Sequence, residues 1–349
     1  MKQQTLKFWK YSPVAKPQYQ GKFCRLPWQQ IQIDEDGDMM LCGCQNHMPY
    51  VVGNIYHNSI EEIWNNPQSQ KVRDSVMSGD FTYCNWTCPY LNNLEPRPEH
   101  APTVTAWPRH IKIDLDLSCN LKCPSCREQP IIEKNSHRID QQTKVFETII
   151  DHAEARPESW ILVSPIASGE LFASASGLAF LRTLVQRRIK NVRLIINSNG
   201  TLFVRNQELL VALLPQIQQI TVSLDAATAE TYALVRGGNW SDVMQGLEIV
   251  RSRLHGLNFV VQKNNYHEIE KFVELAMQKG AQACFQKLHN WGHWTAEWWG
   301  DNNVVDRTKN EYTQAVAMLA KAKSLHGDWV RMNGDLENYV NKALTLQVN

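Results

Sequence analysis

The stretch that decides the fold runs from Ile111 to Cys126, Ile-Lys-Ile-Asp-Leu-Asp-Leu-Ser-Cys-Asn-Leu-Lys-Cys-Pro-Ser-Cys. Its first part alternates apolar and polar side chains, a pattern typical of a β-strand. Cys119, Cys123 and Cys126 follow at once. The sequence therefore predicts a strand that carries a three-cysteine loop at its carboxyl end.

Downstream of this stretch, short β-rich runs alternate with helical patterns. The β-rich runs lie at 160–163, 192–196, 220–224, 258–261 and 283–285. The helical patterns lie near 141–155, 175–189, 205–214, 241–254, 266–279 and 309–323. Strands that alternate with helices predict βα units and a parallel sheet. We therefore expect an α/β protein with a partial (β/α)6 TIM-like barrel, whose chemistry belongs at the carboxyl ends of the strands.

Upstream, the chain has a different character, with many cysteines and short elements. Residues 31–33 and 39–41 flank the turn residues 34–38, which predicts a hairpin. Residues 59–62, Ser-Ile-Glu-Glu, fit a capping box that starts a helix. The expected domains are an N-terminal arm at 1–21, a small cysteine-rich domain at 22–95, a Pro-rich linker at 96–108, the partial barrel at 109–300 and a C-terminal helical extension at 301–349.

Composition narrows the class of protein. The chain is 43% hydrophobic, which predicts a folded protein, and its 36 Lys and Arg balance 35 Asp and Glu. This balance gives no electrostatic reason to expect a nucleic-acid or membrane partner. The start resembles no signal peptide, and the longest weakly polar run, 160–181, contains Glu170. We therefore expect a cytoplasmic protein, in which clustered cysteines bind metal more often than they form disulfides.

The three-cysteine loop has a specific chemical use. Three thiolates can hold three irons of a [4Fe–4S] cube and leave the fourth iron open to a ligand. Zinc with a distant fourth ligand is the alternative.

From Cys119 onward for roughly 180 residues, the sequence resembles the radical S-adenosylmethionine (SAM) enzymes. Ser168-Gly169-Glu170 is similar to a family Gly-Gly-Glu segment, and Asn199 lies in a similar Asn-Gly turn. The resemblance implies that SAM is bound by side chains or backbone after successive strands. These residues are Ser168, Gly169, Glu170, Asn199, Ser223, Asp225, Arg236 and Gln262.

The resemblance to the radical SAM enzymes also implies a reaction. A [4Fe–4S] cluster on Cys119, Cys123 and Cys126 would bind SAM at its open iron. One electron would then cleave SAM to methionine and a 5′-deoxyadenosyl radical, which abstracts hydrogen from the substrate. The protein would supply placement and the exclusion of water.

The upstream cysteines resemble a second module, the SPASM auxiliary-cluster domain, which in most relatives follows the barrel. The resemblance covers about 65 residues from Cys24 onward. It implies one auxiliary [4Fe–4S] cluster, and Cys44 is the rival of Cys42 as a ligand. A structural zinc knuckle is the alternative. The expected ligands are Cys24, Cys42, Cys84 and Cys88.

Two features remain outside these motifs. Residues 291–299 contain four Trp, which would form either an aromatic wall for a large substrate or a plug in the core. Cys284, in the last β-rich run, would be either a hydrogen donor to a substrate radical or an inert buried thiol.

Three functions follow as hypotheses. Relatives with this auxiliary module mostly modify ribosomally made peptides by cross-linking, epimerisation or backbone splicing to a β-amino acid. We therefore expect a precursor peptide as substrate, a separate leader-peptide-binding protein as a partner, and flavodoxin or ferredoxin as reductant. The alternatives are a dehydrogenase or epimerase of a small molecule such as a sugar, and a non-catalytic metal-binding scaffold.

Overall fold

A computed structural model of the chain shows an α/β architecture in two compact units. Unit 1 comprises Met1–Leu117, Lys134–Gly169 and Gln186–Leu194, and unit 2 comprises Ser118–Glu133, Glu170–Val185 and Ile195–Asn349. The structure describes residues 17–43, 47–85, 88–92, 94–166, 168–290, 294–306, 308–309, 311–333, 336–338 and 340–341. Cys44 and the Trp-rich residues 291–293 therefore lie outside the described residues.

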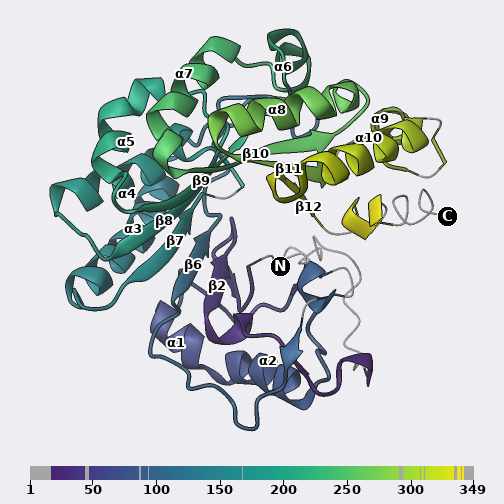
Figure 1. Ribbon diagram of the computed structural model, residues 1–349. Helices are drawn as coiled ribbons and strands as arrows, with labels where there is room; N and C mark the ends of the chain where they lie inside the picture. Colours follow the sequence, from purple (N-terminus) through teal and green to yellow (C-terminus); the bar gives the residue numbers. More distant parts are fainter. Residues whose placement is uncertain are drawn as a thin grey trace. The chain divides into compact units, whose positions relative to one another are not determined.

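Parallel strands form the centre of unit 1. β6 (His110–Ile113) pairs in parallel with β7 (Ile161–Pro165), and β7 pairs in parallel with the start of β8 (Val192–Ser198). On its other side β6 pairs in parallel with β2 (Gln30–Ile33), in the register Ile33 opposite Ile113. A strand of the cysteine-rich segment therefore extends the same sheet as the first βα strand (Figure 1).

The predicted hairpin is confirmed in this segment. β2 pairs in an antiparallel manner with β3 (Asp38–Met40), which in turn pairs with β4 (Gly53–Asn54). The predicted capping box is also confirmed: Ser59 Oγ accepts from the backbone of Glu62, and the Glu62 side chain accepts from the Ser59 backbone, at the start of α1 (Ile60–Asn65).

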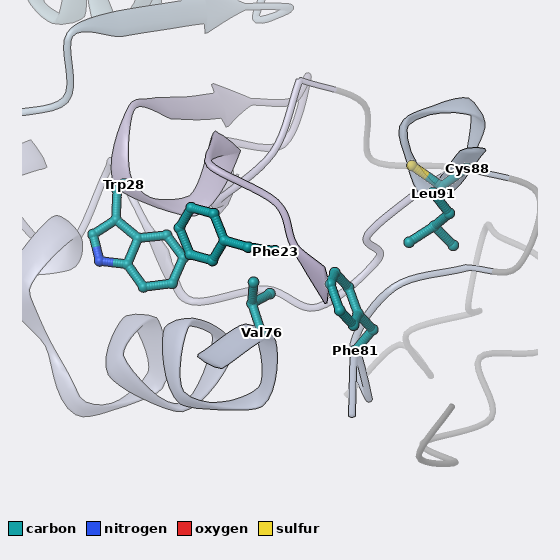
Figure 2. Close-up of a cluster of buried hydrophobic side chains, with 6 residues drawn as sticks. All are labelled: Phe23, Trp28, Val76, Phe81, Cys88 and Leu91. Carbon is teal, nitrogen blue, oxygen red and sulfur yellow. The ribbon is translucent and has the colours of Figure 1, made fainter. Parts of the chain in front are cut away.

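A hydrophobic cluster holds the rest of the cysteine-rich segment together. It lies beside α2 (Pro67–Ser78) and the antiparallel pair of β1 (Lys22–Phe23) and β5 (Glu95–Pro96). Figure 2 shows Phe23, Trp28 and Val76 gathered on one side of this cluster and Cys88 with Leu91 on the other. Because aromatic side chains bury much area each, they allow a small segment with short strands to form its own core.

Four parallel strands form the centre of unit 2. Their order is β9 (Ile217–Ser223), β10 (Leu254–Val261), β11 (Gln282–Lys287) and β12 (Val330–Met332). Helix α8 (Ile269–Lys279) lies over β10 and β11 (Figure 1), where the Phe272 ring lies 4.6 Å from that of Phe259 and 5.9 Å from that of Phe285.

The remaining elements connect these strands. The helices are α3 (Ser136–Glu154), α4 (Ala175–Gln186), α5 (Gln207–Leu213), α6 (Ala229–Val235), α7 (Trp240–Val250), α9 (Ala296–Asn302) and α10 (Glu311–His326). Short 3₁₀ turns lie at Pro17–Tyr19, Leu26–Trp28, Pro89–Asn92, Leu171–Ala173, Val204–Asn206, Arg251–Arg253, Tyr266–Glu268 and Gly327–Trp329. None of the helices in the described part of the chain is both long and apolar enough to span a bilayer.

The predicted α/β class and its βα alternation are confirmed. The six predicted strands all form, as β6 to β11, and the structure adds β12 beyond β11. β12 was missed because three residues carry too little periodicity to distinguish a strand from a loop. Helix α6 was also missed, since its seven residues are shorter than the window that reveals a helical period.

Candidate functional site

The three-cysteine loop lies in unit 2, and hydrogen bonds between Cys119 and Ile131 hold its two ends together. Cys119 and Ile131 exchange two backbone hydrogen bonds, of 2.6 and 3.2 Å, which join the two ends of the loop. Inside it, the backbone N–H of Cys126 donates to the carbonyl of Cys123 at 2.8 Å. The loop therefore presents its thiols from a fixed backbone, with Cys123 buried and Cys119 and Cys126 half-buried.

Burial and nearby cations act in opposite directions on these thiols. Burial raises the pKa of Cys119, and it raises the pKa of Cys123 to about 11, while the Arg236 guanidinium lowers both. Arg127 Nε donates to Cys126 Sγ at 3.5 Å. Since iron binds the thiolate, cluster assembly must release these protons, and the two arginines favour that release.

In the described ranges no three His, Cys, Asp or Glu side chains converge closely enough to hold one metal ion. Three thiolates on one loop can hold three irons of a [4Fe–4S] cube, and that this loop holds such a cluster stays a prediction.

Glu170 is almost fully buried and fixes the start of the loop after β8. Its carboxylate accepts hydrogen bonds from Ser198 Oγ, at 2.9 and 3.0 Å, and from the backbone N–H of Asn199, at 2.6 Å, and of Phe172, at 3.2 Å. Burial raises the pKa of Glu170, and these donors oppose the rise. In this structure Glu170 therefore positions Asn199, and its predicted direct contact with SAM stays a prediction.

Asn199 connects that loop to the cysteine loop. Its Nδ2 donates to Asn120 Oδ1 at 3.0 Å and lies 3.8 Å from Cys119 Sγ, a sulfur hydrogen bond. Its Oδ1 accepts from the backbone N–H and the hydroxyl of Thr201, at 3.0 and 2.6 Å. Sequence analysis predicted Asn199 but missed Asn120 and Thr201, although each stands next to a motif residue.

Asp225 and Arg236 form a buried ion pair after β9. Arg236 Nη1 donates to Asp225 Oδ2 at 3.0 Å, and the Val260 backbone N–H donates to Asp225 Oδ1 at 2.7 Å. Burial raises the pKa of Asp225 while Arg236 lowers it, and burial lowers the pKa of Arg236 while Cys123 and Asp225 outweigh it. Asp225 has a φ of 58°, a left-handed conformation that is uncommon for a residue with a side chain.

Several buried donors in this part of unit 2 have no partner. They are Arg236 Nε, Gln262 Nε2 and the Tyr232 hydroxyl. A buried donor without an acceptor costs free energy, so such atoms mark a place where a ligand acceptor is missing. SAM carries a carboxylate and polar ribose oxygens, and three thiols stand nearby, so the residues present fit both SAM and the cluster.

The other predicted cofactor residues have simpler surroundings. Ser223 is half-buried at the end of β9, in register with Asn258 of β10. Gln262 follows β10, and its backbone N–H donates to Asn265 Oδ1 at 2.9 Å. Ser168 and Gly169 lie in unit 1, on the loop after β7, where Ser168 is exposed and Gly169 is half-buried.

Cys284 lies in the first half of β11, against Gly256 of β10. A Cβ at Gly256 would stand only 2.8 Å from Cys284 Sγ, so the sulfur fills the space that a larger residue at 256 would need. Burial raises the pKa of the thiol, which is half-buried. Its role as a hydrogen donor stays a prediction.

The predicted auxiliary ligands fall into two groups in unit 1. Cys24, Cys84 and Cys88 all belong to or pack against the hydrophobic cluster of Figure 2. Cys42 is buried in the bend after β3 and is not a member of that cluster. Lys112 Nζ donates to the Gly43 carbonyl at 3.0 Å, which ties this bend to β6.

The described part of the Trp-rich segment is neither a buried plug nor fully exposed. Trp294 and Trp298 stack with ring centroids 4.3 Å apart, and both are half-buried. The end of α9 is joined to the loop after β10, because the Lys263 backbone N–H donates to the Asn302 carbonyl at 3.2 Å.

Two protein-family models match the chain. Residues 24–89 match SPASM, an iron-sulfur cluster-binding domain, and residues 117–276 match the radical SAM superfamily. The chain belongs to the radical SAM superfamily. Its SPASM domain precedes the radical SAM domain.

Individual relatives are more distant. The chain is similar to an AdoMet-dependent heme synthase of Methanosarcina barkeri, at 28% identity over 198 residues, 53% of this chain and 50% of that protein. The chain thus spans about half the length of the curated relative that it matches.

Two solved structures of one bacterial protein also resemble the chain. Streptococcus suis SuiB bound to S-adenosylmethionine matches with a TM-score of 0.45 at 13% identity, over 80% of this chain and 60% of that chain. SuiB bound to its precursor peptide SuiA matches with a TM-score of 0.45 at 13% identity, over 81% of this chain and 66% of that chain.

Proposed function

We propose that this radical SAM enzyme binds SAM and abstracts hydrogen from a ribosomally made peptide. The observation that supports the SAM site best is the pairing of three thiols on one closed loop with unpartnered buried donors. Arg236 connects the thiols with the unpartnered donors, since it lowers the pKa of Cys119 and Cys123 and its own Nε has no acceptor.

In this proposal the chain's own residues bind and orient. Cys119, Cys123 and Cys126 hold a [4Fe–4S] cluster, and Asn199 donates to the Cys119 sulfur. When bound, the cluster supplies the electron that cleaves SAM to methionine and a 5′-deoxyadenosyl radical, which takes hydrogen from the substrate.

Two further groups complete the proposed site. Arg236, which Asp225 holds in place, donates from Nε to the SAM carboxylate, and Gln262 Nε2 donates to a second acceptor of the cofactor. Glu170 acts through Asn199 and is therefore a positioning residue. Ser168, Gly169 and Ser223 are proposed to contact the cofactor as the family resemblance implies.

The peptide substrate rests on the SPASM domain. Relatives with this module mostly act on ribosomally made peptides, which is why we propose a precursor peptide and a separate leader-binding protein as partners. One auxiliary [4Fe–4S] cluster on Cys24, Cys42, Cys84 and Cys88 would relay electrons from flavodoxin or ferredoxin.

A small-molecule substrate is the second candidate. It is favoured by one observation, the similarity to a curated protein named AdoMet-dependent heme synthase. The substrate in that case would be a porphyrin-type ring with carboxylate side chains.

The test separates the chemistry from the substrate. The chain is reconstituted anaerobically with iron, sulfide, SAM and dithionite, and 5′-deoxyadenosine is measured with and without a peptide encoded next to the gene. We expect deoxyadenosine from the wild type and none from the triple variant Cys119→Ala, Cys123→Ala, Cys126→Ala. Survival of cleavage in the triple variant would contradict the proposed cluster site.

Mass spectrometry of the peptide then decides the substrate. A mass or mobility change that requires SAM supports the peptide. An unchanged peptide, together with deoxyadenosine production that rises when a porphyrin carboxylate is added, would favour the second candidate.

A further inference from the structure

Unit 1 contains a cavity of about 540 Å³ that the proposed reaction does not use. It lies at the amino ends of β7 and β8, whereas the residues proposed to bind SAM follow the carboxyl ends of strands. We propose that this cavity is a second ligand site that binds a nucleoside phosphate, with the base on Trp160 and the phosphates on Arg188 and Lys190.

The lining of the cavity carries an excess of positive charge. Arg187 already pairs with Asp151 and Glu154. Arg188 and Lys190 are exposed and form no ion pair with any described residue, and Arg193 is exposed beside them. Glu158 is the one further carboxylate in the lining, so the two cations without an ion pair favour an anionic ligand.

Trp160 supplies a flat apolar face next to these cations. Its side chain is 53% exposed, although it directly precedes the buried strand β7. An indole held at the wall of a cavity offers a stacking surface that any nucleobase can use. An aromatic ring beside these two cations matches a ligand that joins a planar ring to phosphate.

The walls of the cavity are held in place before any ligand arrives. Asn191 Nδ2 lies 2.8, 2.9 and 2.8 Å from the carbonyls of Ala153, Arg156 and Ser159, and joins the loop after α3 to the start of β8. Arg188 has a φ of 55°, which is uncommon for a residue with a long side chain. Preorganised walls lower the entropic cost of binding.

The helix dipole alone does not explain this arrangement. Arg187 and Arg188 follow the end of α4, where cations are favoured by the dipole. That effect falls off within one turn, so it does not account for Arg193 inside β8 or for the exposed Trp160.

The size of the cavity favours a small ligand over a nucleic acid. Its volume lies within the range of roughly 300–1,000 Å³ that is common for small-molecule sites. The net charge of the whole chain is only +1, so no extended basic surface is expected to track a polynucleotide.

The test is calorimetric titration of the full-length, reconstituted protein with ADP, adenosine and pyrophosphate. Saturating SAM is present throughout, so that the adenine of ADP does not enter the SAM site. We expect saturable binding of ADP. Arg188→Ala and Lys190→Ala should each weaken it by about tenfold, because each removes a charge-assisted contact.

Trp160→Ala separates the ring from the phosphates. The substitution should weaken the affinity for ADP by at least about fivefold and leave the affinity for pyrophosphate unchanged, since only ADP has a base to stack. The matched controls are Arg205→Ala and Lys271→Ala, because both residues are exposed and lie outside this cavity. Neither substitution should change the affinity for ADP or for pyrophosphate.

The proposal is overturned if ADP shows no saturable binding, or if the control variants weaken it as much as the cavity variants. Equal loss of ADP and pyrophosphate in Trp160→Ala would also overturn it, because the indole would then act on the phosphate or on the fold. These readouts require no radical chemistry, so they are independent of the proposed reaction.

Discussion

At the scale of the residue, the Asp225–Arg236 ion pair places two charged groups largely away from water. Asp225 is buried and only 12% of the Arg236 side chain is exposed, so each charge offsets the cost of removing the other from water. A buried pair of this kind adds little net stability, yet the loss of one member leaves an uncompensated charge. The pair therefore fixes the orientation of Arg236 more than it stabilises the fold.

This gives a prediction for a double-mutant cycle. Arg236→Ala should lower the free energy of unfolding by about 3–5 kcal/mol, because Asp225 stays buried without its partner. Arg236→Ala combined with Asp225→Asn should recover part of that loss, as measured by denaturant unfolding. SAM binding should remain weak in both variants, since Nε is absent in both. Full additivity of the two substitutions would contradict the pairing.

A second prediction concerns the turn between β2 and β3. Asp34 Oδ1 accepts from the backbone N–H groups of Asp36 and Asp38, at 3.0 and 2.9 Å. Burial raises the pKa of Asp34 from 3.8 to about 7, so the folded state binds this proton more tightly than the unfolded state. The free energy of unfolding should therefore fall as the pH rises from about 4 to about 7.

Asp34→Asn removes this titration while keeping an acceptor in the turn. Between pH 5 and 7.5 the variant should lose less stability than the wild type, as measured by denaturant unfolding. Asp36→Asn, exposed in the same turn, is the control and should follow the wild type. Parallel pH profiles of the Asp34 variant and the wild type would show that the assigned pKa is wrong.

Single residues also show what the sequence could and could not predict. The cysteines were singled out by their spacing, and Asn199, Asp225 and Arg236 by the family resemblance; their roles stay predictions. Their pairwise contacts were not predicted, since a hydrogen bond such as that from Asn199 to Asn120 joins residues far apart in the chain. For Glu170 the motif predicted a ligand contact, which stays a prediction, and it did not predict the hydrogen bonds from Ser198, Asn199 and Phe172.

At the scale of the element, the side chain of Cys284 in β11 occupies the space beside Gly256 of β10. A Cβ there would approach Cys284 Sγ to 2.8 Å, so glycine is required by space and not by backbone conformation. Gly256→Ala should therefore destabilise the protein by about 1–3 kcal/mol through overpacking.

The partner substitution tests this explanation. Cys284→Ala removes the sulfur, so Gly256→Ala should cost clearly less in that background, as measured by thermal or denaturant unfolding. An equal cost in both backgrounds would locate the strain elsewhere, for example at the Gln282 carbonyl, which a Cβ would approach to 3.4 Å.

Helices and strands with a clear spacing of apolar residues were predicted best from the sequence. The strands β6 to β11 and the capping box at Ser59 were all predicted from local patterns. The parallel pairing of β2 with β6 was not, because register between distant strands depends on tertiary contacts. The short β4 and β12 lacked enough residues to show alternation.

At the scale of the whole molecule, the eight described cysteines contain no disulfide, and seven of them belong to the two proposed clusters. One open and one fully ligated [4Fe–4S] cluster predict about eight irons in each reconstituted chain. The triple variant of Cys119, Cys123 and Cys126 should retain about four, and so should a triple variant of Cys24, Cys84 and Cys88.

Iron and sulfide analysis, together with the electron paramagnetic resonance spectrum of the reduced protein, checks this. Each variant should lose one of two distinct signals. Cys284→Ala is the control and should keep both. A wild-type content of about four irons would contradict the auxiliary cluster, and about twelve would require a third cluster that this set of cysteines cannot ligate.

The parallel pairing of β2 with β6 also has a consequence for biosynthesis. A growing chain leaves the ribosome with its amino end first, so β2 emerges well before β6 exists. During that interval β2 has only β3 as a neighbour, and the edge that will meet β6 is open to other chains. Until β6 has been synthesised, the cysteine-rich segment therefore carries an open strand edge that can pair wrongly with another chain.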